Sequence, residues 1–395
     1  MDGPLDGVRV LDLGQIFMGP YCGFVLAGLG ADVVKIEPPG GETIRSRDDD
    51  GYPPAYYFYN SNKRDVVLDL KSADGKELFR ELVAQADVVI ENFRPGTMDR
   101  LGLGYEELVD VNPELVYAHG SGYGEYGPYT DDPAMDLAIQ ARGGVMTTTG
   151  FPDGPPIRAG PGVADILGGI HLATGVIGAL YERDRTGEGS YVDVGMFDCV
   201  YPTLASPVTA HLRGAEEPLR FGNRHAGGSL APYNAYETAD GYVVVICVTD
   251  EQWTHLADEM GESWLSEDDR FATKVARANH VDQVDELVQA WVEKREKDAV
   301  AERLNERGIP CAPVQTLDEI TSDPQLHARG MINHVESDGS VDGEIPAPGV
   351  PIHLDGERPP ISKAPRLGEH TDEVFRELGY SRTALKEFRT RDVIE

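Results

Sequence analysis

One acidic side chain of this 395-residue chain stands in a setting that suits covalent chemistry. Asp165 follows the glycine-rich stretch 160–162 and opens a long apolar segment, which predicts a helix over 165–181. The plainer interpretation is a helix N-cap, because a carboxylate there accepts a backbone N–H and faces the positive end of the helix dipole. The other is a nucleophile, since the surrounding glycines leave room for a bulky acyl group. The two roles are compatible.

Basic side chains gather where strands are expected to end. Each lies near the end of a predicted strand or the start of a predicted helix, and the set is Lys63, Arg64, Lys71, Arg94 and Arg100. Segment 92–96 comes directly after a predicted strand over 88–90. Ligands of parallel sheets bind outside the carboxyl ends of the strands. These cations therefore predict a phosphate site, and a solvated surface charge is the alternative for each one taken singly.

Other familiar site patterns give little support for a bound cofactor. A GxGxxG pattern spans 122–127, but Pro128 and the acidic segment 130–133 follow it, which favours a turn over a dinucleotide-binding helix. Neither a Walker A sequence, nor HExxH, nor GxSxG occurs. We therefore expect no permanently bound cofactor and no metal ligands.

The elements that must position these side chains alternate between strands and helices. Such alternation predicts a parallel sheet with helices on both faces, hence a Rossmann-like α/β domain. Strands are expected over 8–13, 33–37, 66–70, 88–90, 115–118 and 187–193, and helices over 20–29, 74–86, 105–111, 165–181 and 196–213.

A second region begins where the chain becomes rich in Gly, Pro, Asn and Arg, between 216 and 241. It predicts a strand over 242–248 and helices over 251–260, 281–294 and 299–307. Two more helices are expected near the C-terminus, over 371–378 and 382–389. We place the start of a second domain near 216, and the periodicity alone does not show whether the C-terminal tail rejoins the first domain.

The net charge of −33 excludes a nucleic-acid partner held by a general positive field. With 9 Lys, 26 Arg and 68 acidic residues, the surface is typical of a halophilic protein, and an ordinary acidic surface is the alternative. The four cysteines form no CxxC pair, segment 1–14 has no cationic start followed by an apolar run, and no window approaches 18 uninterrupted apolar residues. We therefore expect a cytoplasmic protein without membrane contact.

Taken in order, several motifs resemble those of the class III coenzyme A transferases (CaiB/BaiF type), which include formyl-CoA transferase. The similarity spans nearly the whole chain. Its motifs are 5-LDGVRVLDL, 18-MGP, 29-LGADVVKIE, 62-NKR, 68-LDLK, 91-ENFRPG, 150-GFPDGPP and 367-LGEHTDE.

The resemblance implies a large Rossmann-like domain built from both ends of the chain, over 1–215 and 325–395, a smaller inserted α/β domain over 216–324, and an interlocked homodimer. The family's catalytic aspartate matches Asp165. Family contacts to coenzyme A carry over to Phe17, Met18, Leu68, Lys71, Asn92, Phe93, Arg94, Arg100 and Asp136. We add Gln15 as a candidate side-chain donor, and Gly227 and Gly228 as the counterpart of the family's active-site glycine loop.

Two departures from the family matter for the site. Pro38 stands where one relative has an arginine, which bears on adenine packing, and only Gly227-Gly228-Ser229 stands where that relative has four glycines. The superfamily also contains α-methylacyl-CoA racemases, which need an acid/base histidine. Met135 occupies that position here and cannot transfer a proton.

The resulting prediction is an acyl-CoA:carboxylate CoA-transferase that works through aspartyl anhydride and aspartyl-CoA thioester intermediates. Succinyl-CoA is the expected donor and a dicarboxylate such as mesaconate the expected acceptor. Arg45, Arg47, Arg142 and Arg158 are candidates for the second carboxylate, although each could be structural. The alternatives are a racemase-like isomerase and a non-catalytic acyl-CoA-binding protein.

Overall fold

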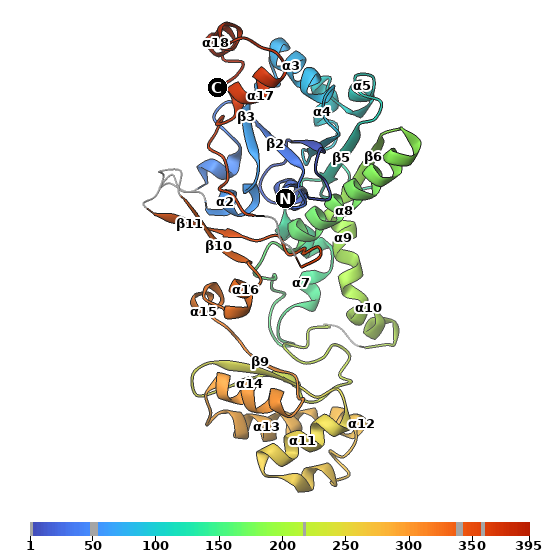
Figure 1. Cartoon of the computed structure of the whole chain (residues 1–395). Coiled ribbons are helices and arrows are strands. Elements are labelled where there is room, and N and C mark those ends of the chain that lie inside the picture. The colour runs from blue at the N-terminus through green and yellow to red at the C-terminus, as the bar shows by residue number, and fades with distance from the viewer. Residues whose placement is uncertain (1–2, 48–53, 216–218, 337–342, 357–359) are drawn as a thin grey trace. The chain divides into compact units, whose positions relative to one another are not determined.

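The computed structural model describes residues 3–47, 54–215, 219–336, 343–356 and 360–395 (Figure 1). It forms two compact units. Unit 1 comprises Met1–Arg142, Gly160–Pro202 and Asp323–Glu395, and unit 2 comprises Gly143–Ala159 and Thr203–Ser322. Segments 143–159 and 203–215 thus group with unit 2, whereas the sequence pattern assigned both to the large domain. The predicted boundary at 216 lies outside the described residues.

A six-stranded parallel sheet organises unit 1. Its strands are β1 (Arg9–Asp12), β2 (Asp32–Glu37), β3 (Arg64–Val67), β4 (Val88–Glu91), β5 (Val116–Ser121) and β6 (Ser190–Gly195). Their order is β3-β2-β1-β4-β5-β6, so the chain runs outward from β1 to β3 and then crosses back to place β4 beside β1, where the strand order reverses. The predicted parallel α/β sheet is confirmed. Crevices outside the carboxyl ends of the strands at such a crossing are where ligands bind.

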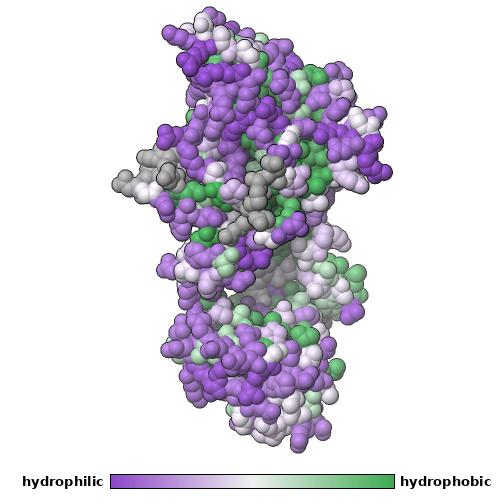
Figure 2. All heavy atoms as spheres, viewed as in Figure 1, coloured by the Kyte–Doolittle hydropathy of each residue, from purple (hydrophilic) through white to green (hydrophobic). Residues whose placement is uncertain are grey.

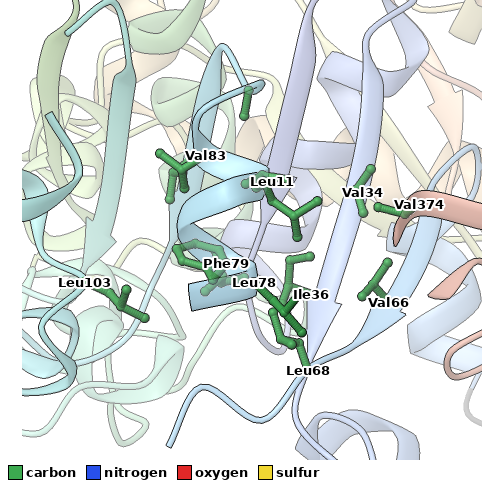
Figure 3. Close-up of a cluster of buried hydrophobic side chains, with 14 of the residues drawn as sticks. Leu11, Val34, Ile36, Val66, Leu68, Leu78, Phe79, Val83, Leu103 and Val374 are labelled. Atoms are coloured by element: carbon green, nitrogen blue, oxygen red, sulfur yellow. The ribbon is translucent and has the colours of Figure 1, made fainter. Parts of the chain in front are cut away.

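Both faces of the sheet are buried, because alternate strand residues pack against different helices. Leu11, Val34 and Val66 of the strands share one cluster with Leu78 and Phe79 of α3 (Ala73–Val83) and with Val374 of α17 (Thr371–Glu377) (Figure 3). The C-terminal helices α17 and α18 (Arg382–Thr390) therefore belong to the core of unit 1. On the opposite face, Val10 and its neighbours pack against α1 (Met18–Gly28) and α8 (Val163–Thr186).

Helices α1 and α8 approach each other closely at glycines. A Cβ atom on Gly169 would lie 2.7 Å from the Met18 carbonyl oxygen, and one on Gly168 would lie 2.9 Å from the Met18 methyl carbon. Helix α8 is long and apolar enough to cross a membrane by length and composition, but half of its most apolar window is buried in the fold. We interpret α8 as a core helix of unit 1.

Unit 1 also contains shorter elements. They are η1 (Thr43–Ser46), α2 (Pro54–Asn60), α4 (Thr97–Leu101), α5 (Tyr105–Val109), α6 (Asp136–Arg142), α9 (Met196–Val200), α16 (Pro324–Ala328) and the antiparallel pair β10 (Ile332–Glu336) and β11 (Glu344–Pro348). The single helix expected over 196–213 is wrong. The segment divides into α9, the 3-10 turn η2 (Tyr201–Leu204) and α10 (Ala205–Leu212), because Pro202 has no N–H to continue α9.

Unit 2 has its own core. Strands β7 (Tyr233–Glu237), β8 (Tyr242–Ile246) and β9 (Cys311–Pro313) form an antiparallel sheet. Trp253 and Val288 lie in the hydrophobic cluster behind it. The helices are α7 (Val145–Thr148), α11 (Asp250–Met260), η3 (Ser263–Ser266), α12 (Lys274–Asn279), α13 (Val281–Val292), α14 (Lys297–Glu306) and α15 (Leu317–Thr321). The strand predicted over 242–248 corresponds to β8.

Candidate active site

The turn after β1 and the loop after β4 are tied together at the crossing point of the sheet. The Gln15 N–H donates to Asn92 Oδ1 at 2.7 Å, and Asn92 Nδ2 donates to the Gln15 carbonyl at 3.0 Å. Both sides of the Gln15 backbone are therefore fixed by one amide. This pairing brings together two segments that are 77 residues apart in the chain.

Asp165 lies in the first turn of α8, with only 9% of its surface exposed. The residue at the N-cap is Gly162, and the Ala164 N–H of the first turn donates to Asp136 Oδ1 at 2.8 Å. The N-cap interpretation of Asp165 is therefore wrong, because the helix begins two residues earlier than the apolar pattern indicated. A Cβ atom on Gly162 would lie 3.6 Å from the Phe17 ring and 3.7 Å from Asp165 Oδ2, so Gly162 keeps this corner open.

Asp165 lines a cavity of about 550 Å³ at the carboxyl edge of the sheet. Predicted site residues that share its wall are Gln15, Met18, Asn92, Phe93 and Arg94. The sequence analysis missed Ile16, Ser121, Thr130, Asp132 and Met196, which also line it. Ser121 is the last residue of β5 and Met196 directly follows β6. The strand-end rule that selected Arg94 could therefore have found both residues.

Burial raises the pKa of Asp165 to about 7, and the nearby Asp136 carboxylate adds to the rise while Arg47 opposes it. A carboxyl group in this range is ionised in part near neutral pH and is a stronger base than an ordinary aspartate. Because Asp136 already accepts hydrogen bonds from Ala164 and Gln140, Asp165 is the carboxylate left to react. The arrangement suits a nucleophile that must form and release an acyl bond.

A second cavity of about 370 Å³ adjoins the first, and Gln15, Phe93 and Thr97 line both. Its wall includes the buried Leu68 and two exposed cations, Lys71 and Arg100. Aliphatic surface beside lysine and arginine suits a ligand with a flat apolar part and phosphates. Pro38, the departure noted in the sequence, also lines this cavity.

The four arginines considered for a substrate carboxylate differ in their surroundings. Arg45 pairs with Glu37 at 2.7 Å and lies over the Tyr56 ring, so it is a structural residue. Arg142 is held by Asp132 at 2.6 Å. Arg158 belongs to unit 2. Gly227 and Gly228 also belong to unit 2, and their φ angles of 84° and 61° are in the left-handed region that favours glycine. Arg47 is exposed and acts electrostatically on Asp165.

Comparison with known proteins identifies the class. The family model for CoA-transferase family III matches residues 5–371. A succinyl-CoA:mesaconate CoA-transferase from Haloarcula hispanica is 38% identical over 391 residues, covering 95% of this chain and 97% of the relative. A succinate–glutarate CoA-transferase from Agrobacterium fabrum is 37% identical, covering 95% and 96% of the two chains.

A crystal structure of a CAIB/BAIF family protein from Brucella suis superimposes with a TM-score of 0.85 and 35% identity, covering 96% of this chain and 100% of that one. The chain therefore belongs to CoA-transferase family III. It is an enzyme that uses coenzyme A as a co-substrate, as the sequence predicted. Within the part of the chain that the structure describes, no group of three His, Cys, Asp or Glu residues could hold a metal ion.

Proposed function

We propose that this enzyme transfers coenzyme A from succinyl-CoA to a second dicarboxylate, with Asp165 as the nucleophile. The observation that carries the proposal is the buried carboxylate of Asp165 in a cavity that shares Gln15 and Phe93 with a second cavity fit for a nucleotide. One cavity suits the acyl chemistry, and the other suits the adenosine and, together with Arg94 from the wall of the first, the phosphates of coenzyme A.

The reaction begins when an Asp165 carboxylate oxygen attacks the thioester carbonyl of the donor. The C–S bond breaks and coenzyme A leaves as a thiolate, giving a mixed anhydride. The thiolate then attacks the aspartyl carbonyl, which releases the donor acid and leaves an aspartyl-CoA thioester. The acceptor carboxylate attacks that thioester and expels the thiolate again. Attack of the thiolate on the acceptor carbonyl of the second anhydride yields the product and restores the Asp165 carboxylate.

Charge that develops on the carbonyl oxygens needs donors in place before the reaction. We assign the Gln15 side chain to this role, with backbone N–H groups of Gly227 and Gly228 as further candidates. Lys71, Arg94 and Arg100 would hold the phosphates, with Phe17, Met18, Leu68, Asn92, Phe93 and Asp136 around the ligand. The site must exclude water at the anhydride and thioester stages, because both intermediates hydrolyse.

The dicarboxylate assignment rests on the relatives' names and on one arginine. Relatives at 37–38% identity are named for transfers involving succinyl-CoA or succinate with mesaconate, glutarate or D-citramalate. Arg47 is the arginine of the four that acts on the Asp165 carboxylate, and its exposed guanidinium is available to a distal carboxylate. A racemase is disfavoured, since the cavity wall carries Met135 where an acid/base histidine would be needed.

The rest of the prediction also stands as a proposal: a Rossmann-like large domain, an interlocked homodimer, a cytoplasmic location and a halophilic source. The parallel strand order supports the first. Ile170, Ile177 and Tyr181 are exposed on one side of α8, which supports a protein partner there. Hydrophilic residues cover most of the face seen in Figure 2, in keeping with the charge of −33.

The test is a coenzyme A exchange screen. Succinyl-CoA is offered with a panel of monocarboxylic and dicarboxylic acids, and new CoA esters are separated and quantified. We expect transfer to C4 or C5 dicarboxylates and a loss of that preference in Arg47→Ala. Equal rates with monocarboxylic acids, or an unchanged preference in the variant, would contradict the dicarboxylate assignment.

A further inference from the structure

Ile16, in the wall of the Asp165 cavity, has a backbone conformation that isoleucine rarely adopts. Its φ angle is 65°, in the left-handed region. Among the described non-glycine residues, Asn62, Asp355 and Asp392 also have positive φ, and Ile16 is the β-branched member of this set. A β-branched residue persists there only where its surroundings enforce the conformation, and such residues cluster at functional sites.

A buried carboxylate supplies that enforcement. The Ile16 N–H donates to Glu42 Oε2 at 2.8 Å, and Glu42 is 2% exposed. The other oxygen, Glu42 Oε1, lies 3.0 Å from Nζ of the fully buried Lys35. If Ile16 relaxed to negative φ, its N–H would turn away from the buried Glu42 carboxylate, and losing a hydrogen bond to a buried charge is costly.

Lys35 also holds Gly14, the residue on the other side of Gln15 from Ile16. Lys35 Nζ donates to the Gly14 carbonyl at 2.6 Å, and the Gly14 N–H donates to Asp12 Oδ1 at 2.7 Å. Asp12 in turn pairs with the buried Lys63 at 2.7 Å. Burial would lower the pKa of Lys35, but Glu42, Asp12 and Glu37 raise it above its usual value, so the ammonium stays charged.

These contacts converge on Gln15, which lies between the two held residues and lines both cavities. We propose that the buried Lys35–Glu42 ion pair acts as a positioning pair for CoA transfer. It holds Ile16 in the left-handed conformation and so fixes Gln15 at the junction of the acyl and nucleotide cavities. Neither Lys35 nor Glu42 lines either cavity, so they act through the turn. This inference rests on the proposed function.

The experiment compares variants of Glu42 and Ile16 in the full-length enzyme. Glu42→Ala removes the acceptor of the Ile16 N–H, and we expect kcat to fall about 10- to 100-fold while KM for succinyl-CoA stays within about threefold. Glu42→Gln keeps an oxygen acceptor and should retain most of the kcat. Ile16→Gly in the Glu42→Ala background should recover part of it, since glycine adopts positive φ without enforcement.

Asp32→Asn is the matched control, because Asp32 is an ion-paired carboxylate at the amino end of β2 and its loss should leave kcat unchanged. Since Glu42→Ala leaves a lone buried ammonium, Lys35→Met/Glu42→Leu removes both charges and decides the question if the single variant does not fold. It should show the same loss of kcat.

Unchanged kcat in folded Glu42→Ala or in folded Lys35→Met/Glu42→Leu, or no recovery by Ile16→Gly, would overturn the inference. Asp165→Ala is measured beside them. Turnover that survives in Asp165→Ala contradicts the proposed function itself, whereas an inactive Asp165→Ala with a fully active Glu42→Ala contradicts the positioning role alone.

Discussion

The two cavities at the carboxyl edge of the sheet share part of one wall but differ in what their other residues can do. The first contains a buried carboxylate, Asp165, whose pKa is raised to about 7. The second combines the aliphatic Leu68 with the exposed cations Lys71 and Arg100. The first cavity therefore serves the covalent chemistry, and the second serves the binding of coenzyme A. Substitution of Asp165 in the first cavity should change kcat, and substitution of Lys71 or Arg100 in the second should change KM.

The largest expected effect is the loss of turnover in Asp165→Ala. Removing a covalent nucleophile should lower kcat by about 10³-fold or more. Affinity for coenzyme A should stay within about threefold, because the phosphates are assigned to Lys71, Arg94 and Arg100 and not to Asp165. Calorimetric titration with coenzyme A measures the affinity, and a steady-state transfer assay measures kcat. Asp184→Ala, at the exposed far end of the same helix, is the control and should keep full activity.

Next in size is the effect of the same carboxylate on stability. Because the pKa of Asp165 is raised in the folded state, the native protein binds more protons than the unfolded chain between about pH 4 and 7. The free energy of unfolding therefore falls as the pH rises through that window. Asp165→Asn lacks this penalty and should be more stable than wild type at pH 8, by roughly 2–4 kcal/mol, but not at pH 4. Urea unfolding at both pH values measures it, and an equal difference at the two would count against the raised pKa.

Smaller effects are expected in the nucleotide cavity. Lys71→Ala and Arg100→Ala should each raise KM for the CoA ester by about 5- to 20-fold, with kcat changed by less than about twofold. The wild-type KM for the CoA ester should also rise with KCl, because salt screens the exposed charges of Lys71 and Arg100. A fall in kcat with unchanged KM would show that the division between the cavities is wrong.

The smallest effect concerns Asp136, whose charge contributes to the raised pKa of Asp165. Asp136→Asn keeps an oxygen for the Ala164 N–H but removes the charge, so the pKa of Asp165 should fall. Since the nucleophile must be ionised, kcat/KM rises with pH in the wild type, and the variant should reach its plateau at lower pH. At pH 6 its kcat/KM, taken relative to its own plateau, should exceed that of wild type by about two- to fivefold. An unmoved midpoint would assign the titration to another group.

The sheet of unit 1 was predictable because each strand is a short apolar run between helical patterns. The strands expected over 33–37 and 88–90 match β2 and β4 within a residue. The break after α9 was missed, since the apolar pattern continues through Pro202. The pair β10 and β11 was also missed, because its strands carry prolines and an Asn-His centre that do not read as a strand.

The site divides in a similar way. Residues at strand ends, such as Asn92 and Arg94, followed from the sheet topology, and Asp165 from its glycine setting and the family resemblance. The Lys35–Glu42 pair did not follow, because buried ion pairs depend on tertiary contacts between a strand and a 3-10 turn. The left-handed Ile16 was equally hidden, since no local pattern predicts positive φ at isoleucine.

The most direct test of the account is to trap the covalent intermediate. The enzyme is mixed with succinyl-CoA without an acceptor acid, treated with hydroxylamine, digested and analysed by mass spectrometry. We predict an aspartyl hydroxamate on the peptide that contains Asp165, formed only when succinyl-CoA is present. Modification of a different carboxylate, or an unmodified Asp165 in enzyme that turns over under the same conditions, would contradict Asp165 as the residue that carries coenzyme A.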